Sequence, residues 1–128
     1  MPYYYKIDKE HRVVLTTAFG AVTLADLLAH REQVLNDPDF DPTYSQIVDF
    51  TQATKMEVRG QDVEQFAQYD LFSPQSRRAL VAPSNEKYGL CRMYATLREV
   101  HGETGIRVFH AIDEALDWVF SEGTPEPC

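Results

Sequence analysis

The chain has 128 residues, of which 44% are hydrophobic and 25% are charged, as is typical of one soluble globular domain. Its 12 Lys and Arg against 20 Asp and Glu give a net charge of -8, which repels phosphate backbones and anionic lipids. No apolar run in the sequence approaches the length of a membrane-spanning helix. These numbers disfavour nucleic-acid and membrane partners.

The first residues lack the charged segment and the long apolar segment of a secretion signal, so we expect a cytoplasmic location. The two cysteines are Cys91 and Cys128, and neither their number nor their spacing predicts a disulfide framework. We expect both to be free thiols. The four histidines are scattered without metal-ligand spacing, so we expect no metal and no cofactor.

The N-terminal part of the sequence predicts a β-hairpin followed by a helix. Residues 3–8 alternate in the manner of a half-buried strand, and residues 11–19 repeat the pattern. We expect these strands to be antiparallel, with a turn longer than two residues because Lys-Glu suits tight turns poorly. Thr23 and Asp26 form a weak capping box at a helix start. The stripe of that helix consists of Leu24, Leu27, Leu28, Arg31, Val34 and Leu35.

The rest of the chain predicts a series of strand and helix units. Strands alternating with helices indicate parallel strands joined by right-handed helical crossovers. Because the strands alternate and are not continuously apolar, we expect one sheet face to be covered and the other to be free. The expected strands are 45–50, 77–82 and 106–110, the expected helices are 60–69, 86–101 and 113–121, and residues 51–59 are expected to form a loop.

The sequence therefore predicts a two-layer α/β fold for a single domain over residues 1–121. Its sheet is five-stranded and mostly parallel, with an N-terminal antiparallel hairpin and helices on one face. The free face carries Tyr4, Arg12 and Arg107. Residues 122–128 have the composition of a flexible tail.

Ligands of parallel α/β sheets collect beyond the carboxyl ends of the strands, next to helix N-termini. Three predicted junctions of this kind are residues 49–54, 83–88 and 110–113. The alternatives for individual side chains are helix capping for a serine or asparagine, pairing with an acid for an arginine, and core packing for a tyrosine. The candidate ligand-binding residues are Asp49, Thr51, Ser84, Asn85, Tyr88 and Arg92.

No catalytic set is evident in the sequence. A reactive thiol needs an accessible, electropositive place and a neighbouring base, whereas Cys91 stands in a helical stripe that predicts burial. The glycines do not form a phosphate-binding loop. We therefore expect that the protein is not an enzyme.

The element order, the segment DFTQAT at residues 49–54 and the segment EALDWV at 114–119 resemble the SpoIIAA-like, or STAS-type, family. The resemblance covers nearly the whole chain. It implies a superhelix of repeated strands and helices, and a regulatory or protein-interaction role without catalysis. Residues 88–94, YGLCRMY, are similar to a helix start in uncharacterised bacterial members.

Anti-sigma-factor antagonists of this family carry a phosphorylatable serine after the corresponding junction. Here the similar place reads EVRG at residues 57–60, so the serine switch is not carried over.

Two functions follow as hypotheses. The first is a non-catalytic cytoplasmic regulatory module that binds another protein, or a second copy of itself as a homodimer through the free sheet face. The alternative is a small-molecule or anion-binding protein with its pocket at the carboxyl ends of the strands.

Overall fold

One five-stranded sheet organises the structure, a computed structural model that describes residues 2–121. The strands lie in the order β1-β2-β3-β4-β5. β1 and β2 are antiparallel, and the other neighbours are parallel, which confirms the predicted sheet. The strands are β1 (Tyr3–Asp8), β2 (Val13–Thr23), β3 (Ser45–Glu57), β4 (Arg78–Val81) and β5 (Ile106–Phe109).

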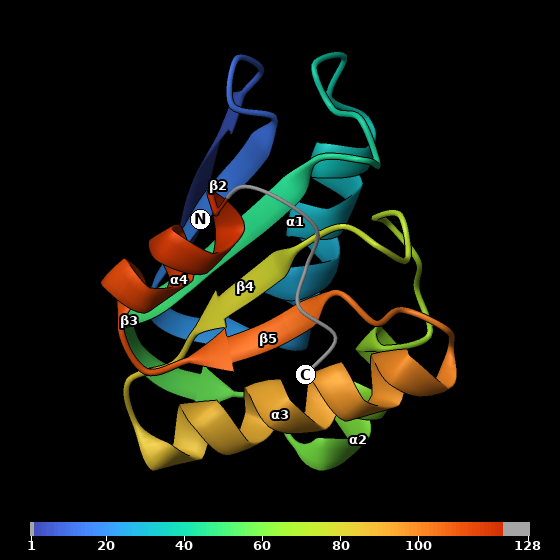
Figure 1. Cartoon of the computed structure of the whole chain (residues 1–128). Coiled ribbons are helices and arrows are strands. Elements are labelled where there is room, and N and C mark those ends of the chain that lie inside the picture. The colour runs from blue at the N-terminus through green and yellow to red at the C-terminus, as the bar shows by residue number, and fades with distance from the viewer. Residues whose placement is uncertain (1, 122–128) are drawn as a thin grey trace.

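Helices cover both faces of this sheet (Figure 1). Three of them connect consecutive parallel strands, and crossovers of one hand in a sequential sheet place their helices on the same side. We call that side the three-helix face, and the opposite side, which carries the last helix, the one-helix face. The helices are α1 (Leu24–Leu35), α2 (Gly60–Phe66), α3 (Asn85–Val100) and α4 (Ile112–Val119).

The position of α4 corrects the expectation that all helices share one face. Ala79 and Val81 of β4 pack with Ala115 of α4, whereas Leu80, which points the other way, packs with Cys91 of α3. Because α4 follows the last strand, no crossover fixes its side. Its apolar residues cover part of the face that was expected to be free, by packing on Val13, Ile47 and Val81.

β3 corrects the predicted loop at residues 51–59, because the strand continues to Glu57 and pairs with an equally extended β2. Register shifts interrupt this pairing between Thr17 and Phe19 and between Gly20 and Ala21. Each bulge adds a residue to β3 and shifts the alternation of its side chains by one position. This shift, together with exposed polar side chains, conceals the strand in the sequence.

The capping box predicted at the start of α1 is confirmed. The Thr23 hydroxyl accepts the Asp26 amide at 3.3 Å, and the Asp26 carboxylate accepts the Thr23 amide at 2.9 Å, which completes the capping box. Within the described residues, no helix is long and apolar enough to cross a membrane. The predicted tail, and Cys128 with it, lies outside the described residues.

Candidate functional site

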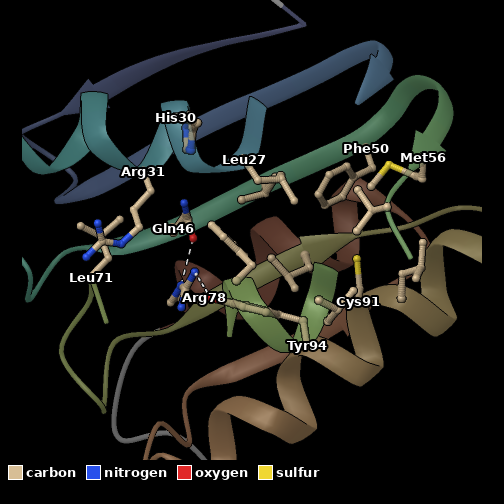
Figure 2. Close-up of a pocket in the computed structure, with 16 residues that line it drawn as sticks. Leu27, His30, Arg31, Gln46, Phe50, Met56, Leu71, Arg78, Cys91 and Tyr94 are labelled. Carbon is tan, nitrogen blue, oxygen red and sulfur yellow. Dashed lines mark hydrogen bonds between the residues drawn. The ribbon is translucent and has the colours of Figure 1, made fainter. Parts of the chain in front are cut away.

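A cavity of about 100 Å³ lies between the three-helix face of the sheet and helices α1, α2 and α3. Figure 2 shows polar side chains gathered at one end of it, beside Leu71, and apolar ones at the other. The polar lining residues are His30, Arg31, Gln46, Arg78 and Tyr94. The apolar lining includes Leu27, Val48, Phe50, Met56, Leu80 and Cys91.

Strand register places the two central polar groups side by side. Gln46 of β3 and Arg78 of β4 are paired residues on neighbouring strands. Side chains alternate along a strand, so both point to the three-helix face, while the next pair, Ile47 and Ala79, points to α4. Gln46 and Arg78 are buried at 3% and 6% exposure.

Arg78 is held by three side chains. Its Nε donates to Gln46 Oε1 at 3.0 Å, its Nη1 donates to Glu103 Oε2 at 2.8 Å, and its Nη2 donates to the Tyr94 hydroxyl at 3.2 Å. The guanidinium carbon also lies 4.8 Å from the ring centre of Phe72. These contacts fix a cation at the wall of the cavity.

Glu103 joins this cation to a second one. Its other oxygen, Oε1, accepts a hydrogen bond from Nε of Arg98 at 2.7 Å. Arg98 also donates to the Ala67 carbonyl at 2.8 Å and to the Asp70 carboxylate at 2.6 Å. Glu103 and Arg98 are each 2% exposed, so the network of Arg78, Glu103 and Arg98 is a buried ionic core.

Arg31 of α1 brings a further cation to the polar end. Its Nη2 donates to the Asp70 carbonyl at 2.7 Å, and its Nη1 donates to the Glu32 carboxylate at 3.3 Å. The guanidinium carbon lies 5.0 Å from the ring centre of Tyr69. Its Nε is buried and has no hydrogen-bond acceptor among the described residues. Such an orphan donor costs about 1–3 kcal/mol.

His30 is a neutral neighbour of these cations. Its Nε2 lies 2.9 Å from the Thr16 hydroxyl, and its ring meets the Tyr3 ring edge to face at 4.8 Å. Burial, reinforced by the charge of Arg78, lowers the pKa of His30 to about 4. At neutral pH the imidazole therefore adds a dipole to the cavity wall and no charge.

The residues that the sequence nominated lie elsewhere, since none of the six lines this cavity. The Asp49 carboxylate accepts the Thr51 amide at 2.8 Å on the surface. Ser84 caps α3 by accepting the Lys87 amide at 3.3 Å, the capping alternative. Asn85 is the exposed first residue of α3.

Tyr88 and Arg92 also lie outside the cavity, and their surroundings differ. Tyr88 stacks on His110, with ring centres 4.2 Å apart and planes 9° from parallel, so it joins two of the three predicted junctions. Arg92 is exposed. Within the described part of the chain, no hydrogen bond or ion pair joins Arg92 to Asp49 or Glu99. Ligand binding by these six residues stays a prediction.

The sequence did contain one signal for the cavity, namely polar residues at positions whose spacing predicts burial. Arg31 stands within the apolar stripe of its helix, and Arg78 shares the phase of Leu80 in its strand. Glu103 gives no such signal because it follows the helix in an irregular segment.

Cys91 is 7% exposed, and burial raises its pKa to about 12. The expectation of a small buried side chain is thereby confirmed, and the thiol is protonated at neutral pH. Around it, no group of three or more His, Cys, Asp or Glu side chains among residues 2–121 is arranged to hold a metal ion.

Comparisons with known proteins identify the fold. The chain is similar to a crystal structure of an uncharacterised protein of the DUF3478 family from Shewanella loihica PV-4, which has a SpoIIAA-like fold. The TM-score is 0.57 at 15% sequence identity, covering 91% of this chain and 93% of that one. No family model and no curated protein matches the sequence. The SpoIIAA-like fold predicted from the resemblance is thus confirmed.

Proposed function

We propose that the protein is a non-catalytic binding module that takes a small, mostly apolar molecule into the cavity beneath α1, α2 and α3. The observation that carries this proposal is an apolar cavity with a fixed cation, Arg78, in its wall. Binding sites for small molecules are concave and mostly apolar, with a few placed polar groups that orient the ligand. This arrangement supports the alternative function from the sequence, with the site moved from the strand ends to the sheet face.

A non-catalytic role is supported by the chemistry of the cavity. Its one thiol, Cys91, is protonated at neutral pH, and a nucleophile needs an adjacent base. His30, the titratable base in the lining, is bonded to Thr16. Among residues 2–121 no hydrogen bond joins the Cys91 thiol to His30, as the pairing of a nucleophile with its base would require.

NMR of methionine methyl groups tests the proposal, because Met56 lines the cavity and Met93 does not. Isovalerate, isoamyl alcohol and benzene are titrated separately into the protein. We expect at least one of them to shift the Met56 signal saturably and to leave Met93 unmoved. Cys91→Met, which fills the cavity, should weaken that shift. A Met56 signal that responds to none of the three would overturn the proposal.

A second candidate, the protein-interaction module expected from the sequence, is favoured by the outward side of α4. Ile112, Leu116 and Phe120 follow one another at four-residue spacing and are 39%, 39% and 43% exposed. Tyr4 and Phe19 are also exposed, with ring centres 5.9 Å apart. Exposed apolar groups that lie next to one another are a feature of contact surfaces. Light scattering that shows a concentration-independent monomer would count against self-association, the homodimer form of this candidate.

A further inference from the structure

The buried groups around the polar end of the cavity carry more positive than negative charge. Arg78 and Arg98 are buried there beside the partly buried Arg31, whose side chain is 16% exposed, whereas Glu103 is the one buried carboxylate among the described residues. Their other acidic partners, Asp70 and Glu32, are at the surface, with side chains 81% and 63% exposed. Because water screens exposed charges better than buried ones, the buried charge at this end of the cavity favours an anion, although the protein has a net charge of -8.

Hydrogen-bond donors at this end also lack acceptors. Nε of Arg31 is buried without a described partner. The Tyr94 hydroxyl accepts from Arg78, and a hydroxyl has one hydrogen of its own to donate. Among residues 2–121 no acceptor takes that hydrogen. A ligand at this end would therefore meet these donors with an acceptor, and the charge balance favours an anionic one.

The opposite end of the cavity is lined by apolar side chains. Phe50, Met56 and Cys91 line it, away from the arginines (Figure 2). The volume of the whole cavity, about 100 Å³, is smaller than the roughly 150 Å³ of an engineered cavity that binds benzene in another protein. The apolar part of a ligand that lies inside this cavity is therefore a short or branched chain.

We infer that the ligand of this cavity is a short, apolar monocarboxylate. Its carboxylate lies at the Arg31, Tyr94 and Arg78 end, and its hydrocarbon lies against Phe50, Met56 and Cys91. A carboxylate is favoured because it is flat and its oxygens fit guanidinium donors. This inference rests on the proposed function and adds the chemical class of the ligand.

The test compares probes of equal shape and different charge on the unaltered protein. Isovalerate and isovaleramide are titrated while the Met56 methyl signal is followed. Charge-assisted hydrogen bonds are roughly twice as strong as neutral ones, so we expect isovalerate to bind about tenfold more tightly than the amide. Isobutyl phosphate serves as a second anion, and we expect it to bind more weakly than isovalerate.

Matched variants locate the carboxylate. Arg31→Gln should abolish the preference for isovalerate over isovaleramide, whereas Arg92→Gln, an exposed arginine of α3 outside the cavity, should retain it. Equal binding of acid and amide to the unaltered protein would overturn the carboxylate and leave the proposed function standing. Tighter binding of isobutyl phosphate would assign the site to phosphate instead. Loss of the preference in Arg92→Gln alone would overturn the cavity assignment.

Discussion

The two faces of the sheet bury different kinds of residue. On the three-helix face, Gln46 and Arg78 are buried together and meet Glu103 from outside the sheet. On the one-helix face, the same two strands present Ile47 and Ala79 to an apolar cluster. One strand position therefore separates a charged environment from a hydrocarbon one.

Selection for stability alone would favour the apolar composition of the one-helix face. Replacing a buried ion pair by well-packed apolar residues is often neutral or stabilising, so the one-helix face shows that this chain can pack an apolar layer. The charges of the three-helix face are therefore better explained by binding than by stability. The cavity and the orphan donor of Arg31 lie on that face.

The largest expected effect comes from removing the carboxylate of the buried network. Glu103→Gln keeps the shape and leaves Arg78 and Arg98 without their shared counter-charge. Breaking a buried pair in this way costs about 3–5 kcal/mol of unfolding free energy, which urea denaturation measures. The control is Glu99→Gln at an exposed site of α3, where we expect a change within about 0.5 kcal/mol. Equal effects in the two variants would contradict the ionic core.

The next largest effect is the dependence of the unfolding free energy on pH that His30 causes. The unfolded chain protonates this residue near its ordinary pKa of 6.5, whereas the folded protein does so near 4. Between these values protonation favours the unfolded state, so stability falls as the pH is lowered through this window. A pKa shift of this size corresponds to roughly 3 kcal/mol of unfolding free energy. Urea unfolding at several pH values measures it, and His30→Gln should flatten the curve.

Other groups titrate differently from His30. Hydrogen bonds from Arg98 and from the His11 backbone lower the pKa of Asp70 and of Asp8, respectively, below 3.8, so the stability that these carboxyls contribute is lost below the window. The pKa of His11 is raised by its hydrogen bond to Asp8, so its contribution has the opposite sign. His11 is at the surface, where such effects are small. An unchanged pH curve in His30→Gln would remove His30 as the cause.

The sequence predicted most of the fold because local patterns carry it. Thr23 with Asp26 marked the start of α1, and the patterns of β1, β4 and β5 gave these strands at nearly their observed bounds. The strand predicted at residues 11–19 is β2, which continues four residues further, to Thr23. The second half of β3 was missed because two bulges change its phase against β2. The side of α4 was missed because it depends on which apolar surface remains uncovered after the crossovers have formed.

The candidate site was less predictable. The rule that ligands collect at strand ends led to Ser84 and Asp49, which satisfy backbone amides. The cavity is instead assembled from α1, α2, α3 and the sheet, whose residues are distant in sequence. Glu103 pairs with Arg78 across 25 positions, and no periodicity connects a helix exit to a strand. Arg31 and Arg78 at apolar positions were the available signal.

The smallest effect tests the one-helix face. Ile47→Val removes one buried methylene from the cluster that Ile47 forms with Ala79 and Val119 and should destabilise by about 0.5–1.5 kcal/mol. Because Ile47 packs against apolar side chains, the loss should be the same at pH 5 and pH 7. It should also add to that of His30→Gln, since the two side chains share no partner. A loss that changed with pH would show that the two faces are coupled through the sheet.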